Sequence, residues 1–145
     1  MNLAHLIRRF ATSLSPLPPD ATDTVWVAGW LRGTELDLWS TMSNADRRHS
    51  IDVARRFARR RPDATKPEMA GALLHDVGKV EADLGTLARV AATIVGPRGR
   101  RFRLYHDHEA IGARLAEAAG ADPVTVALIE GHGAAADDLR AADDV

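Results

Sequence analysis

Nearly all apolar residues of this chain recur at the three- and four-residue spacing of an α-helix. The first such stripe consists of Leu3, Leu6, Ile7, Phe10 and Leu14. Strand-like alternation of apolar and polar residues is hard to find. The pattern therefore predicts an all-α fold, and a length of 145 residues suits one helical bundle around a single core.

Capping residues, glycines and prolines divide the chain into predicted helices. After a first helix over 3–14, we expect two short helices within 26–42 that break near Gly33, and then helices over 44–61, 65–76, 83–95, 107–119, 123–130 and 135–144. Either Ser43 or Asn44 would cap the helix that begins near 44. No repeat or composition shift marks a domain boundary, so residues 1–42 are expected to pack as helices on a core formed by 43–145.

Composition excludes several kinds of site. The chain has no cysteine, which removes disulfides, thiolate zinc sites and cysteine nucleophiles, so any metal must be held by nitrogen and oxygen ligands.

The apolar N-terminal stripe is interrupted by Arg8 and Arg9, and no apolar run approaches the length of a membrane span. We therefore expect a soluble, cytoplasmic protein without a membrane partner.

The charge of the chain is close to neutral overall but unevenly placed. Seven arginines lie between Arg47 and Arg61, and four lie between Arg98 and Arg103. Such runs are typical of a solvated helix face, although they could instead form a rim that attracts phosphorylated ligands or nucleic acid. They carry little aromatic interleaving for base stacking, so a nucleic-acid partner is not expected.

Two adjacent His-Asp pairs occur, beginning at His75 and at His106, so such a pair alone says little. Helical phase separates them. Asp76 continues the apolar stripe of Met69 and Leu73, with His75 near its edge, whereas His106 lies opposite the apolar face of its helix. A buried, unpaired carboxylate is costly, and a bound metal ion is one remedy. The first pair is therefore the candidate for chemistry.

The same test of helical phase places five polar side chains on inner faces of four predicted helices: His49, His75, Asp76, His108 and His132. A lone histidine on an apolar face is more often a satisfied core residue than a metal ligand. Helical bundles, however, build metal sites from convergent side chains of this kind. Gly112, one turn beyond His108, would leave room there for another helix or for a ligand.

Four segments of the chain resemble the HD superfamily of metal-dependent phosphohydrolases. The stretch LLHDVGK at 73–79 resembles its central motif, and HEAIGA at 108–113 resembles a later histidine element of its two-metal members. VALIEGHG at 126–133 resembles the next element, and LRAAD at 139–143 resembles the closing aspartate element. The resemblance implies a helical bundle of the HD type.

A ligand set for one or two metals follows from this resemblance. The first metal would be held by His49, His75, Asp76 and Asp143, and Asp76 would bridge to a second metal held by His108 and His132. Helical phase favours Asp143 over Asp144, because Asp143 lies one turn after Leu139. It favours Asp143 over Asp137 and Asp138 less firmly.

The function implied is that of a phosphomonoesterase or phosphodiesterase that acts on a nucleotide-like phosphate ester through metal-activated water. One or two iron, manganese, zinc, nickel or cobalt ions per chain would suit the imidazole and carboxylate ligands. Asp76 and Lys79 are the predicted catalytic residues, and Lys79, Arg48 and Arg101 are candidates for binding the phosphate. The alternative is a non-hydrolytic HD scaffold that binds a nucleotide or a protein partner in a regulatory role.

Overall fold

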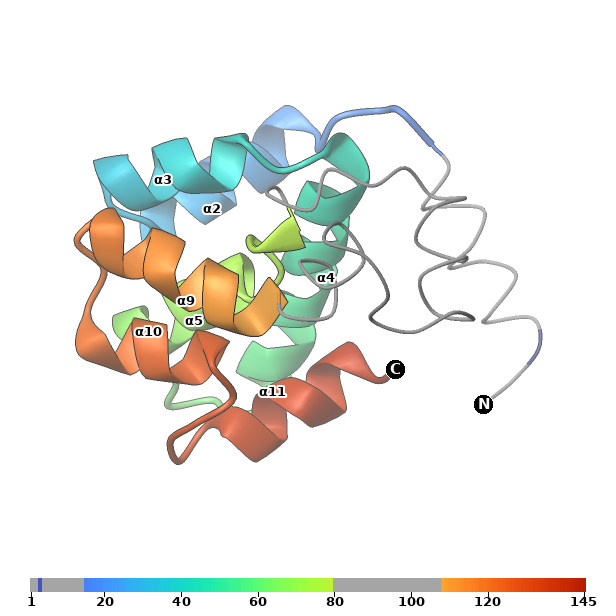
Figure 1. The fold of residues 1–145 in the computed structure, drawn as a ribbon. Helices are drawn as coiled ribbons and strands as arrows, with labels where there is room; N and C mark the ends of the chain where they lie inside the picture. The colour runs from blue at the N-terminus through green and yellow to red at the C-terminus, as the bar shows by residue number, and fades with distance from the viewer. Residues whose placement is uncertain (1–2, 4–14, 80–107) are drawn as a thin grey trace.

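The computed structural model describes residues 3, 15–79 and 108–145 (Figure 1). Within these residues it contains seven α-helices and no strand: α2 (Ala21–Trp30), α3 (Gly33–Ser40), α4 (Asn44–Arg60), α5 (Lys66–Leu74), α9 (His108–Ala118), α10 (Pro123–Ile129) and α11 (Ala136–Asp143). The predicted all-α fold is confirmed. The predicted helix over 83–95 and, apart from Leu3, the one over 3–14 lie outside the described residues, as do His106 and Arg101.

Side-chain caps determine where several of these helices begin. The hydroxyl oxygen of Ser43 accepts a hydrogen bond from the backbone N–H of Asp46 at 3.1 Å, which identifies Ser43 as the cap of α4. Thr65 and Glu68 cap α5 reciprocally, and Asp122 caps α10 ahead of a proline. The helices therefore start close to the positions predicted from these residue types.

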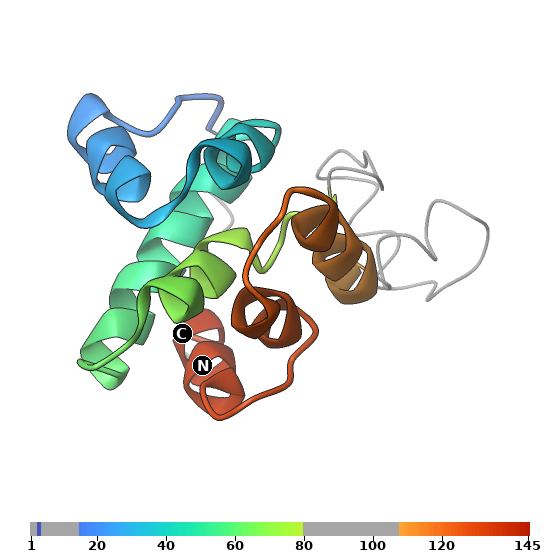
Figure 2. The same ribbon diagram turned by 90° about the vertical axis from the view of Figure 1, so that its left-hand side faces the viewer.

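Helix α5 forms the centre of the bundle. Its residues from Glu68 to Leu74 are all buried, and it contacts α2, α3, α4 and α10. Helices α2 and α3 lie along one side of the bundle, and α10 and α11 lie along the opposite side (Figures 1 and 2). Helix α11 packs on α4, and α10 packs on α9. The carboxyl end of α5 therefore points into the protein, where several helices meet. None of the described helices is both long and apolar enough to cross a membrane.

Most arginines of α4, and its C-cap Arg61, contact other parts of the protein. Arg47 lies over the ring of Trp39, Arg48 donates to the carbonyl oxygens of Ser15 and Leu17, Arg55 pairs with Asp23, Arg56 donates to the carbonyl oxygen of Ala142, and Arg60 and Arg61 pair with Asp138. These contacts join α4 to the segment before α2, to α2, to α3 and to α11. Most of the run therefore contacts other parts of the protein, while Arg59 and Arg60 are exposed, as expected of a solvated face.

Two glycines allow the chain to pass α9 at very short range just after α5. A Cβ atom placed on Gly78 would lie 1.8 Å from the carbonyl oxygen of His108. A Cβ atom on Gly112 would lie 3.0 Å from the backbone nitrogen of Gly78. Neither glycine has a positive φ, so both are required for space rather than for backbone conformation. The room predicted beside His108 is thus filled by the segment that carries Gly78.

Replacement of Gly78 by alanine should destabilise the fold, because its methyl group would overlap the backbone of α9. We expect Gly78→Ala to lower the free energy of unfolding by about 1–3 kcal/mol or more, as overpacking does. In the control Gly29→Ala, the added Cβ meets no atom within 4 Å, and stability should stay the same or rise by up to about 1 kcal/mol. Urea denaturation measures both, and a Gly78→Ala variant as stable as the original chain would contradict the close approach.

Candidate metal centre

His75 and Asp76 follow α5 in two short turns. The helix predicted to continue through Asp76 ends at Leu74, whose carbonyl oxygen accepts from the backbone N–H of Val77 at 3.0 Å. The carbonyl oxygen of Asp76 accepts from the N–H of Lys79 at 3.1 Å. Both His75 and Asp76 remain buried, with 8% and 4% of their surface exposed. The turns therefore keep an imidazole and a carboxylate together inside the bundle.

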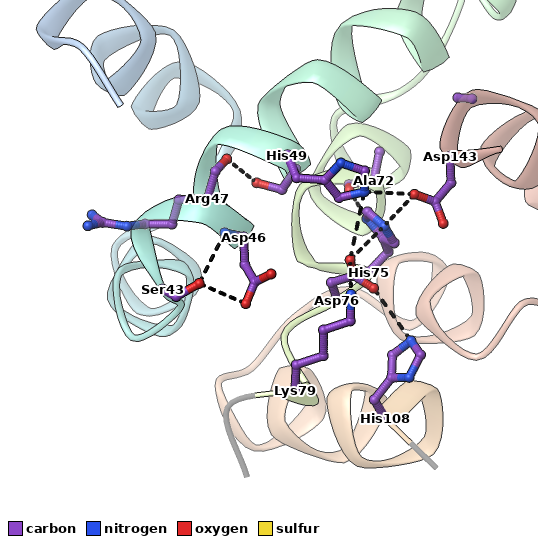
Figure 3. A network of polar contacts seen from close by, with 12 residues as sticks. Ser43, Asp46, Arg47, His49, Ala72, His75, Asp76, Lys79, His108 and Asp143 are labelled. Carbon is purple, nitrogen blue, oxygen red and sulfur yellow. Dashed lines mark hydrogen bonds and ion pairs between the residues drawn. The ribbon is translucent and has the colours of Figure 1, made fainter. Parts of the chain in front are cut away.

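Three side chains from separate parts of the fold form a group that could hold a metal ion. One ligand atom each from His49 on α4, His75 after α5 and Asp143 at the end of α11 lie within 4.8 Å of one another (Figure 3). Oδ1 of Asp143 is 2.9 Å from Nε2 of His49 and 3.6 Å from Nε2 of His75. We call these three residues the metal centre.

Asp76 lies directly beside the metal centre. Its Oδ2 atom is 3.4 Å from Nε2 of His75, 4.0 Å from Nε2 of His49 and 2.7 Å from Nζ of Lys79. Its Oδ1 atom is 3.4 Å from Nε2 of His108. The structure therefore brings together the four predicted ligands of the first metal, and adds His108 and Lys79 on the other side of Asp76 (Figure 3).

Nearby positive charge keeps both carboxylates ionised. Burial alone would raise the pKa of Asp76, but the charges of His75 and Lys79 and a hydrogen bond from His108 outweigh it and hold this pKa well below its ordinary value. For Asp143, burial also acts to raise the pKa, and the hydrogen bond from His49 and the nearby charge of His75 hold it far below that of a free aspartate. Ionised carboxylates are the form that binds a cation.

The ring of His75 is oriented as a ligand. Its Nδ1 atom lies 2.7 Å from the carbonyl oxygen of Ala72, and because a carbonyl can only accept, Nδ1 carries the hydrogen. In the neutral ring, Nε2 then holds a lone pair. This Nε2 atom is buried and has no hydrogen-bond partner, which is costly unless something else binds it. A histidine whose other nitrogen donates to a backbone carbonyl is the usual arrangement of a metal ligand.

The sequence did not lead us to expect the hydrogen bond from His75 to the carbonyl oxygen of Ala72. A signal for it exists, because Ala72 is one of the last residues of α5, whose carbonyl oxygens lack partners within the helix. A donor three residues later is well placed to reach such an oxygen. The imidazole and carboxylate donors of the centre, together with the orphaned Nε2 atom of His75, fit a divalent transition metal.

His132 is not brought to the metal centre, and the prediction that it faces inward is wrong. Its side chain is 74% exposed and lies 3.6 Å from the carboxylate of Glu130. Helix α10 ends before it: Gly131 has φ of 83°, and the N–H groups of Gly131 and His132 donate to the carbonyl oxygens of Leu128 and Ala127. This is a Schellman turn, so helical phase cannot be extended past Gly131. The predicted helix over 123–130 already ended before Gly131, so the error lay in carrying its helical phase on to His132.

Among the C-terminal aspartates, only Asp143 reaches the metal centre. Asp138 pairs with arginines of α4, whereas Asp137 pairs with Arg140 at 2.7 Å on the surface. Asp144 is exposed. The preference for Asp143 that rested on helical phase agrees with this arrangement.

Arg48 holds the chain before α2 rather than lying at the centre. Its guanidinium donates to the carbonyl oxygens of Leu17 and of Ser15, the latter at 2.8 Å. Beside it, Nδ2 of Asn44 donates to the carbonyl oxygen of Pro16 at 2.8 Å. Within the described residues, these contacts assign Arg48 a role in anchoring that segment to α4.

Comparison with known proteins gave no match: no family model, no curated protein and no solved structure resembles this chain closely enough to be significant. What the centre can do is therefore judged from its own atoms. Together with Asp76, the centre offers two imidazoles and two ionised carboxylates that can hold a divalent cation, and the ammonium of Lys79 places a positive charge beside Asp76. This combination suits an anionic ligand beside a metal.

The metal-free protein should lose stability as the pH rises above neutral. Burial lowers the pKa of His75, but the negative charges of Asp76 and Asp143 outweigh it and raise this pKa from 6.5 to about 9. A raised folded-state pKa contributes stability that is complete below pH 6.5 and is lost between pH 6.5 and about 9. The free energy of unfolding, measured with urea across this interval, should fall.

The substitution His75→Gln should remove most of this fall, whereas the exposed-site control His132→Gln should retain it. The attribution to His75 would be refuted by an equal pH dependence in His75→Gln and in the original chain.

Proposed function

We propose that this chain is a metal-dependent phosphohydrolase, a phosphomonoesterase or phosphodiesterase acting on a nucleotide-like phosphate ester. The observation that carries the proposal is the convergence of His49, His75 and Asp143 within 4.8 Å, with Asp76 beside them and Lys79 at its edge. The resemblance of the LLHDVGK stretch to the central HD motif supports the same activity and an HD-type bundle.

His49, His75 and Asp143, with Asp76, would hold the ion. When bound, a divalent transition metal supplies Lewis acidity that activates water as a nucleophile at neutral pH and polarises a phosphoryl oxygen. The donor types suit iron, manganese, zinc, nickel or cobalt alike. Because His132 lies on the surface, the arrangement favours one ion per chain over two.

Lys79 and His108 fix the orientation of Asp76 by occupying its two oxygens separately. Nζ of Lys79 is 2.7 Å from Oδ2, and Nε2 of His108 is 3.4 Å from Oδ1. The ammonium of Lys79 is therefore held next to the place where a substrate phosphate would meet the metal centre. A fixed positive charge there stabilises the negative charge that develops on the phosphoryl oxygens during transfer.

A non-hydrolytic scaffold that binds a nucleotide or a protein partner is the second candidate. It is favoured by the contact between Lys79 and Asp76, because an ammonium 2.7 Å from Oδ2 neutralises this buried carboxylate without a metal. Such a scaffold would bind its ligand and show no turnover, whereas a hydrolase would show both.

Hydrolysis of a nucleotide panel tests the proposed activity. Full-length protein loaded separately with manganese, iron, cobalt, nickel or zinc should release phosphate or nucleoside from at least one nucleotide. Lys79→Ala should lower kcat by about 10²–10³-fold, the effect of removing one charge-stabilising donor. The control Lys66→Ala changes an exposed lysine at the start of α5 and should leave kcat unchanged.

Two outcomes would count against the proposed hydrolysis. Inactivity of the fully metal-loaded chain on the whole panel would contradict it, and nucleotide binding without turnover would favour the scaffold. Equal loss of activity in Lys66→Ala and Lys79→Ala would remove the role assigned to Lys79.

A further inference from the structure

Helix α11 is attached to α4 by a series of polar contacts along the two helices. Asp138 pairs with Arg60 and Arg61, the carbonyl oxygen of Ala142 accepts from Arg56, and Asp143 accepts from His49. Successive residues of α11 thus meet earlier and earlier residues of α4, so the two helices run antiparallel. The last contact of this series, between His49 and Asp143, lies in the metal centre.

The contact of Arg56 is placed at a helix end that needs a donor. Nε of Arg56 donates to the carbonyl oxygen of Ala142 at 2.7 Å, and Ala142 is fully buried. This oxygen is one of the last four carbonyls of α11, which have no partner within their own helix. A guanidinium at the C-terminal end also interacts favourably with the helix dipole. The bond is therefore charge-assisted and stronger than a bond between neutral groups.

The same bond fixes the position of the backbone at Asp143. The carbonyl group of Ala142 belongs to the peptide unit that includes the backbone nitrogen of Asp143. His49 and Arg56 are seven residues apart, about two helical turns, and so lie on the same face of α4. Helix α4 thus supplies one ligand directly and holds the backbone from which another ligand extends.

We propose that Arg56 is a positioning residue of the metal centre: it holds the peptide between Ala142 and Asp143 so that the Asp143 carboxylate stays within reach of His49 and His75. The inference rests on the metal site of the proposed function and is independent of whether a phosphate ester is hydrolysed. Arg60 and Arg61 pair with Asp138, more than one turn before Asp143. They attach α11 to the protein but do not fix the position of its last residue.

A double-mutant cycle on metal affinity tests this role. Titration of the full-length chain with Co²⁺, followed by visible absorption and calorimetry, gives the Kd. Arg56→Gln should weaken Co²⁺ binding by about 10–100-fold, the range for residues that orient a ligand. In an Asp143→Asn background, Arg56→Gln should change the Kd by no more than about twofold, because the ligand through which Arg56 acts is already impaired.

Two further variants control the interpretation. Arg59→Gln alters an exposed arginine of α4 that has no side-chain partner among the described residues, and its Kd should match the original chain within about twofold. Arg56→Lys keeps a charged donor and should bind Co²⁺ with intermediate affinity. The cycle can therefore be run with Arg56→Lys if Arg56→Gln does not fold.

The inference is overturned if both Arg56 variants bind Co²⁺ as tightly as the original chain, or if the loss is equal in the Asp143 and Asp143→Asn backgrounds, as a general destabilisation would produce. It is also overturned if the original chain binds no Co²⁺. A chain that shows the predicted cycle but hydrolyses no nucleotide would remove the proposed activity and leave the role of Arg56 in place.

Discussion

The hydrogen bond from Nδ1 of His75 to the carbonyl oxygen of Ala72 is the contact on which the metal centre depends. At 2.7 Å, it satisfies a carbonyl at the end of α5 and fixes which ring nitrogen carries the hydrogen. The other nitrogen, Nε2, then faces Asp76 and Asp143 without a hydrogen-bond partner. Three other helices meet near this nitrogen: α4 and α11 bring the other two members of the centre, and the close approach at Gly78 and Gly112 brings α9 with His108.

Electrostatic balance explains why so many charged groups surround one small volume. The ionised carboxylates of buried Asp76 and half-buried Asp143 repel one another, and in the metal-free protein they are compensated by His75 and Lys79. A bound cation would take over part of that compensation, which links metal binding to loss of the proton from His75. Arg56, Arg60 and Arg61 act on the centre through packing, since all three contact α11, which carries Asp143.

Local rules accounted for most of the fold and for part of the centre. Helical spacing and capping residues such as Ser43 and Asp122 predicted most of the described helices, but α2 begins at Ala21 behind its cap Asp20, earlier than the predicted region 26–42. Inner-face position together with the HDVGK stretch indicated His75 and Asp76. His132 was misplaced because helical phase was carried through the glycine that ends α10.

The partners of Arg48 and Arg56, and the need for space at Gly78, could not be predicted. They depend on segments 30 to 90 residues away in sequence, namely the chain before α2 for Arg48, α9 for Gly78 and α11 for Arg56. Spacing within one helix carries no information on such pairings.

Elemental analysis of full-length protein purified without chelator tests the central claim, that these residues hold a metal ion, most directly. We predict one transition-metal ion per chain, lost in His49→Ala and His75→Ala and retained in His132→Ala; no metal, or two ions with one lost in His132→Ala, would contradict it.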